Sequence, residues 1–231
     1  MFQAILFDKD GTLFDFAATW ESWAANFLLR VSEGDRTRAA DLGVKIGFDL
    51  RTRSFAPDSI VIAGTPGEVA DVLLPHFPGV ELDGFIDMLN EEAETAPQAE
   101  AVPLAPFLDG LKARGLALGV MTNDAVAVAH THLGQSGVTD RFDFIAGFDS
   151  GYGAKPSPEP LLAFCETVGV APEGAVMVGD STHDLIAGRK ANMRTVGVLS
   201  GMANSTTLAP FADIVLPDIG HLPGWLDRVA G

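Results

Sequence analysis

Two aspartates follow directly on an apolar run near the start of the chain. The run Ala4–Phe7 is typical of a buried strand, and Asp8 and Asp10 come after it in the stretch DKDGT. Burying a carboxylate costs several kcal/mol unless a cation or hydrogen bonds compensate for it. If the strand persists, alternation puts both carboxylates on one side and turns Lys9 away from them, out of the chemistry. The two acids lie either in a solvated acidic turn, for which Asp-Gly is common, or beside a positive charge.

A second pair of acids follows another apolar run. Asp180 and Asp184 come after Ala175–Val178 in the stretch GDSTHD. If a helix begins near Ser181, a spacing of four places both carboxylates on one side of its first turn. Such a pair suits a hard cation such as Mg²⁺, which binds few protein oxygens. The alternative is that these acids only stabilise a helix N-terminus.

Two other polar clusters have the same relation to the apolar runs. Thr122 and Asn123 follow Leu116–Met121, and their hydroxyl and amide could hold phosphate oxygens or could simply cap the next helix. Lys155 stands in GAKPSPEP, where the prolines prevent a helix and make the loop rigid. A surface lysine beside a helix start is the alternative there.

The elements that must position these clusters alternate between strands and helices. Helical patterns separate most of the short apolar runs, which predicts βαβ units and a parallel sheet of the α/β class. The predicted strands are Ala4–Phe7, Leu116–Met121, Phe144–Ala146, Ala175–Val178, Thr195–Leu199 and Ile214–Leu216. Ligands of open α/β sheets bind outside the carboxyl ends of the strands, where all four clusters fall.

About a hundred residues between the first two strands interrupt this alternation, far more than one crossover helix needs. The segment contains helical patterns and no convincing strand, and Ala96–Pro106, with three prolines, is expected to be the linker back to the sheet. We therefore predict a core domain of residues 1–15 and 101–231, with an inserted helical domain over residues 16–100.

The four clusters, in this order, resemble the motifs of the haloacid dehalogenase superfamily of phosphohydrolases. The matching stretches are DKDGT, TND, GAKPSPEP and VGDSTHD, and they cover the core on both sides of the insertion. The family resemblance implies a Rossmann-like core sheet. A helical insertion between the first two motifs is similar to the C1-type cap of the phosphoglycolate phosphatase-like branch. The implied activity is hydrolysis of a small phosphorylated metabolite with Mg²⁺ as cofactor.

The resemblance implies distinct roles for the two acids of the first motif. Asp8 would be the nucleophile that forms an aspartyl-phosphate. Asp10 would protonate the leaving oxygen and then activate water, and its backbone carbonyl would bind the metal. A haloalkanoic acid dehalogenase is disfavoured, because those relatives lack the second aspartate.

The other three motifs would bind the phosphate and the metal. Thr122 and the backbone around Asn123 would hold the phosphoryl oxygens, and Lys155 would neutralise charge on the phosphate and the nucleophile. Asp180 would ligate Mg²⁺ directly. Asp184 would either complete the metal shell or orient Lys155. Asp8 and Asp10 complete the predicted metal set.

Substrate selection is expected to lie in the inserted domain. Lys45, Arg51 and Arg53 could bind a second anionic group of the substrate, or could be solvated surface charge. Trp20 and Trp23 could face the site, although packing in the core of the insertion is the favoured interpretation. A phosphomutase of the β-phosphoglucomutase type is one alternative function, but Trp20 occupies the position at which those relatives carry a histidine. A non-catalytic binding protein is another alternative, and retention of all four clusters argues against it.

Composition limits the partners. Of the 231 residues, 47% are hydrophobic and 20% are charged, and the formal net charge is −16. Such a field repels nucleic acid and anionic lipid, so neither is an expected partner. Cys165 is the single cysteine and is expected to fill the core. There is no apolar stretch of membrane-spanning length and no basic N-terminal leader, so we expect a cytoplasmic protein, either a monomer or a homodimer.

Overall fold

The computed structural model describes residues 2–230, which form two compact units. One unit consists of the N-terminal segment up to Phe16 together with the chain from Ala99 onward, and the other of Ala17–Gln98. Each is described separately below. In the described residues no helix is both long enough and apolar enough to cross a bilayer.

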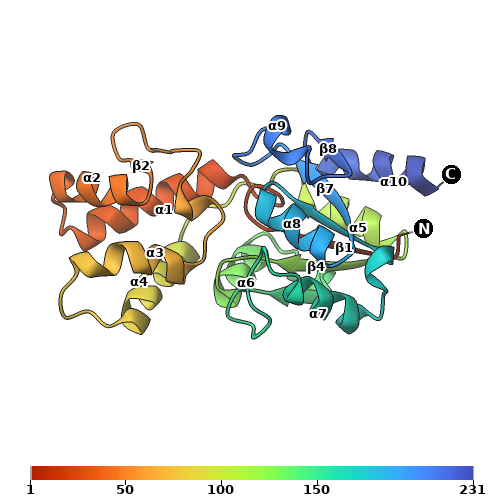
Figure 1. Ribbon diagram of the computed structural model, residues 1–231, viewed down its shortest axis with the longest axis horizontal. Helices are drawn as coiled ribbons and strands as arrows, with labels where there is room; N and C mark the ends of the chain where they lie inside the picture. Colours follow the sequence, from red (N-terminus) through yellow and green to blue (C-terminus); the bar gives the residue numbers. More distant parts are fainter. Residues whose placement is uncertain (1, 231) are drawn as a thin grey trace. The chain divides into compact units, whose positions relative to one another are not determined.

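The first unit is built on a six-stranded parallel sheet with the strand order β5-β4-β1-β6-β7-β8 (Figure 1). Its strands are β1 (Ala4–Phe7), β4 (Ala117–Met121), β5 (Phe144–Ala146), β6 (Ala175–Gly179), β7 (Arg194–Val198) and β8 (Ile214–Leu216). Within β1, Ile5 and Phe7 pack into one hydrophobic cluster, while Ala4 and Leu6 pack into a second. The sheet is therefore buried on both faces, which explains why its strands appear in the sequence as continuous apolar runs.

Helices supply both covering layers of this sheet (Figure 1). The cluster that contains Phe7 includes residues of α5 and α10, whereas the cluster that contains Leu6 includes residues of α7 and α8. The helices are α5 (Leu104–Lys112), α6 (Val126–Gln135), α7 (Glu159–Val168), α8 (Thr182–Lys190), α9 (Ser205–Leu208) and α10 (Leu222–Ala230). Cys165 is buried in the second cluster, as expected, and burial raises the pKa of its thiol to about 11.

Three central strands end together. β1 pairs with β4 on one side and with β6 on the other, and Phe7 is in register with both Val120 and Val178. The residues that follow these strands therefore emerge side by side at the carboxyl edge of the sheet.

The second unit is mainly helical, with α1 (Phe16–Val31), α2 (Arg36–Lys45), α3 (Pro66–Leu73) and α4 (Leu82–Glu94). It also contains a short antiparallel pair, β2 (Phe48–Asp49) and β3 (Ser54–Phe55), where no strand was expected. Strands of two residues are too short to produce an alternating pattern in the sequence. Trp23 lies in the core of this unit, where it stacks on Phe27 and donates a hydrogen bond from Nε1 to the carbonyl of Leu89.

The expected linker Ala96–Pro106 is partly helical, because α5 begins at Leu104. Pro106 lies in the first turn of α5, where a missing N–H removes no intrahelical hydrogen bond. Earlier in the same segment the two connections to the insertion pair with each other. Asp15 donates its N–H to the carbonyl of Ala99, and Ala101 donates to that of Leu13.

Candidate active site

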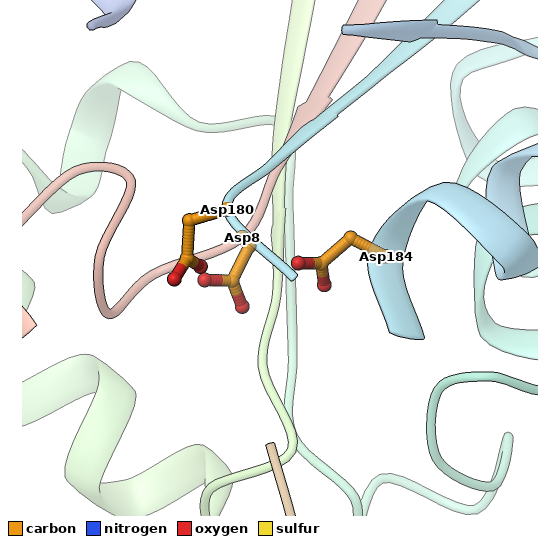
Figure 2. Close-up of side chains that lie close together, drawn as sticks. All are labelled: Asp8, Asp180 and Asp184. Atoms are coloured by element: carbon orange, nitrogen blue, oxygen red, sulfur yellow. The ribbon is translucent and has the colours of Figure 1, made fainter. Parts of the chain in front are cut away.

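Three carboxylates converge at the carboxyl edge of the sheet (Figure 2). Asp8 follows β1, Asp180 follows β6, and Asp184 lies in the first turn of α8. All three are buried, and each offers an oxygen within 4.8 Å of the others. Oxygen donors grouped in this way could hold a hard divalent cation such as Mg²⁺. The side chain of Asp10 is not part of this group.

Lys155, in the loop after β5, binds two of these carboxylates. Its Nζ lies 2.6 Å from Asp8 Oδ1 and 2.7 Å from Asp184 Oδ1, and it donates to the carbonyl of Met121 at 2.8 Å. Only 2% of its side chain is exposed, so Lys155 is not the surface lysine of the alternative interpretation. Burial opposes its charge, but Asp184 and Asp8 outweigh it and raise the pKa of Lys155. The lysine is therefore a permanent cation inside the cluster.

Asn123 holds the backbone of Lys155. Its Oδ1 accepts a hydrogen bond from the N–H of Lys155 at 2.9 Å, and its Nδ2 donates to the carbonyl of Lys155 at 2.8 Å. The side-chain amide of Asn123 thus positions the lysine. Thr122 is buried beside it, with a hydroxyl that accepts from the N–H of Asp124. Neither residue caps the next helix, because α6 begins at Val126 and has no side-chain cap.

The two carboxylate oxygens of Asp184 have different partners. Its Oδ2 accepts hydrogen bonds from the N–H and the hydroxyl of Ser181, which is the N-cap of α8. Its Oδ1 pairs with Lys155. The carboxylate therefore caps the helix with one oxygen and binds Lys155 with the other.

Gly11 and Gly201 enclose Asp180, and Gly201 was not identified from the sequence. A Cβ on Gly11 would lie 2.4 Å from Asp180 Oδ2, and a Cβ on Gly201 would lie 1.7 Å from it. Ser200 ties the two segments together through a hydrogen bond of 2.7 Å from its hydroxyl to the carbonyl of Gly11. The only sequence signal for Gly201 is its place shortly after a strand of the same sheet.

The cluster contains more negative charge than Lys155 balances. Burial raises the pKa of Asp8 to about 7; Lys155 opposes this shift, and Asp184 and Asp10 add to it. Burial, with Asp8 and Asp184, also raises the pKa of Asp180. Full ionisation of these carboxylates requires a further positive charge, so the donor set fits a divalent cation.

Lys9 does not point away from the chemistry as predicted. Its side chain is fully buried, and its Nζ lies 2.6 Å from Asp10 Oδ2, 3.4 Å from Asp124 Oδ2 and 2.9 Å from His132 Nδ1. The prediction is wrong because β1 ends at Phe7, so strand alternation does not extend to the residues beyond it.

The residues considered for substrate selection lie in the second unit. Lys45, Arg51 and Arg53 are exposed, and Arg51 pairs with Asp49 at 3.5 Å. Trp20 is largely buried and contacts Trp23 edge to face, consistent with the favoured packing role of these two residues.

Known proteins match this chain in sequence and in fold. A family model described as "Haloacid dehalogenase-like hydrolase" matches residues 5–198. The chain belongs to the haloacid dehalogenase-like hydrolase family.

Individual relatives support the same assignment. A phosphoglycolate phosphatase from Neisseria meningitidis is 33% identical over 236 residues, covering 96% of this chain and 91% of that protein. An N-acetylmuramic acid 6-phosphate phosphatase from Pseudomonas putida is 30% identical over 205 residues, covering 86% and 83%. The fold is shared with a solved structure from Bacteroides fragilis described as "Putative haloacid dehalogenase-like hydrolase", with a TM-score of 0.73 at 22% identity, covering 96% of this chain and 100% of that one. The predicted family, fold class and phosphatase enzyme class are confirmed.

Proposed function

We propose that this enzyme is an Mg²⁺-dependent phosphatase that hydrolyses a small phosphomonoester through an aspartyl-phosphate on Asp8. The observation that carries the proposal is the contact of 2.6 Å between Asp8 and Lys155, within a cluster of three buried carboxylates. Phosphoryl transfer requires positioning and charge neutralisation more than unusual chemical groups. The names of the relatives favour a phosphoglycolate-like substrate or a sugar phosphate.

The reaction would proceed in two displacements. A carboxylate oxygen of Asp8 attacks phosphorus while the bond to the leaving oxygen breaks, and Asp10 gives that oxygen a proton. Asp10 then takes a proton from water, whose oxygen attacks the phosphorus of the aspartyl-phosphate and regenerates Asp8. Lys155 and Thr122, with the backbone around Asn123, would hold the phosphoryl oxygens during both steps.

Four groups would hold Mg²⁺: the carboxylates of Asp8, Asp180 and Asp184, and the backbone carbonyl of Asp10. When bound, the ion would neutralise charge on the phosphate and allow the carboxylates to remain ionised. We also propose that residues 16–100 act as a cap domain that selects the substrate. The phosphomutase alternative is not favoured, because Trp20 offers no group suited to proton transfer between sugar hydroxyls.

The test is release of inorganic phosphate by the purified protein with Mg²⁺. The panel would include 2-phosphoglycolate, N-acetylmuramic acid 6-phosphate and common sugar phosphates, and Asp8→Asn would be the control. We expect release from at least one ester by the wild type and none by the variant. No release from any ester would contradict the proposal, and conversion of a sugar phosphate to its isomer would support the mutase.

A further inference from the structure

A second buried charge cluster lies next to the three carboxylates. Lys9 is fully buried, and 11% of the side chain of Asp10 and 4% of that of Asp124 are exposed. His132, from α6, is also fully buried. Lys9 and Asp10 lie in the segment after β1, Asp124 in the segment after β4, and His132 in α6. The cluster therefore joins three parts of the core.

Lys9 is held in this cluster as a cation. Its ammonium group lies 2.6 Å from Asp10 Oδ2 and 3.4 Å from Asp124 Oδ2, and these carboxylates compensate for its burial. Because an ammonium group can only donate, His132 Nδ1 must accept the hydrogen bond of 2.9 Å from Lys9. Two partners besides Asp10 thus fix the position of the Lys9 ammonium group.

The two oxygens of Asp10 have different surroundings. Oδ2 is bound by Lys9 at 2.6 Å, whereas Oδ1 is buried and has no hydrogen-bond partner among the described residues. The contact at Oδ2 therefore restrains the orientation of the Asp10 carboxylate. Asp10 lies beyond the end of β1, where it forms an isolated bridge with Phe14, so the pairing of β1 with its neighbours does not extend to it.

We propose that Lys9 is a positioning residue for Asp10, which holds Oδ2 and so fixes the orientation of the carboxylate that transfers the proton. This inference rests on the proposed function, in which Asp10 is the acid and base. Asp124 and His132 act one step further away, by holding Lys9. Lys9 acts on the reaction through Asp10.

The kinetic test uses the double variant Lys9→Met with Asp124→Asn, which removes the cation and one acid together and so avoids leaving Asp124 unpaired opposite Asp10. kcat/KM reports the first half-reaction, in which Asp10 protonates the leaving oxygen. We expect kcat/KM to fall about 100-fold or more for an alkyl phosphate, in the range typical of general acid catalysis. For p-nitrophenyl phosphate, whose leaving group needs no proton, it should fall less than about 10-fold.

The matched control is Lys112→Met, which removes a surface lysine that lies 2.7 Å from Asp143 and should change neither value. An equal loss for both esters in the double variant would indicate a merely structural role and overturn the proposal. If the double variant does not fold, Lys9→Gln takes its place with the same expected difference between the esters.

A crystal structure of the double variant tests the positioning without any activity. We expect the Asp10 carboxylate to move or to occupy more than one conformer, while Asp8 and Lys155 stay in place. An Asp10 carboxylate unchanged from the wild type would overturn the proposal for Lys9. If the wild type releases no phosphate, the proposed function fails by itself, and the crystal structure still decides whether Lys9 positions Asp10.

Discussion

Lys155→Met is the substitution that should affect this protein most. Met keeps much of the length of the lysine side chain but removes the ammonium group that lies 2.6 Å from Asp8 and 2.7 Å from Asp184. The three clustered carboxylates, including Asp180, then have no cation. The variant therefore separates the charge balance of the site from its packing.

The size of the effect follows from the burial of these groups. Removing one partner of a buried ion pair costs about 3–5 kcal/mol, because the remaining charge stays buried without compensation. A domain has about 5–15 kcal/mol of stability in total, so the variant should fold but be weakened. Carboxyl groups with a raised pKa bind more protons when folded than when unfolded, so their stability contribution falls as pH rises. The pKa of Asp8 is already raised to about 7, and loss of Lys155 raises it further. The cost should therefore be larger at about pH 9 than at about pH 6.

Urea unfolding with EDTA, and again with millimolar Mg²⁺, measures this cost. In EDTA we expect Lys155→Met to lose about 3–5 kcal/mol of unfolding free energy relative to wild type. Mg²⁺ should stabilise the variant more than the wild type, because a divalent cation replaces the missing charge. A loss below about 1 kcal/mol in EDTA, the size typical of exposed pairs, would refute the reasoning. Phosphate release should fall by about 10²–10³-fold or more, as when a transition-state charge stabiliser is removed.

Three further outcomes can be measured. Gly201→Ala should displace Asp180 and weaken Mg²⁺ binding measured by calorimetry. The control is Gly110→Ala in α5, where nothing lies within 4 Å of the new Cβ, and this variant should stabilise the protein by about 0.5–1 kcal/mol. Equal Mg²⁺ affinity in both variants would contradict the role of Gly201. Cys165, with its pKa raised to about 11, should resist thiol reagents at neutral pH until urea unfolds the chain, and rapid labelling of the native protein would refute its burial. Trp23→Phe should cost about 1 kcal/mol through the lost hydrogen bond to α4, and unchanged stability would show that this bond contributes nothing net.

The sheet could be predicted because its strands are buried on both faces. Complete burial produces continuous apolar runs, and polar residues mark where each run ends. Asp8 and Asp180 were found in this way, since they directly follow β1 and β6. The short strands β2 and β3 leave no such pattern and were missed.

Sequence spacing also fails to predict the partners of a side chain that binds two separate segments of the structure. The spacing of Ser181 and Asp184 indicates a helix start, but only the fold shows that the second oxygen of Asp184 binds Lys155. The side chain of Asn123 could be interpreted as a phosphate ligand or a cap, and in the structure it holds the backbone of that same lysine.

The sequence by itself determined the parallel α/β class, the family, and the four clusters that supply acids, a hydroxyl and a lysine to one edge of the sheet. Only the tertiary structure decided the surroundings of Lys9, which binds Asp10 beside it in sequence and His132, 123 residues further along. The physical reason is that alternation ends with the strand at Phe7. Beyond that point the direction of a side chain depends on which distant charges can compensate for its burial, and no local pattern contains that information.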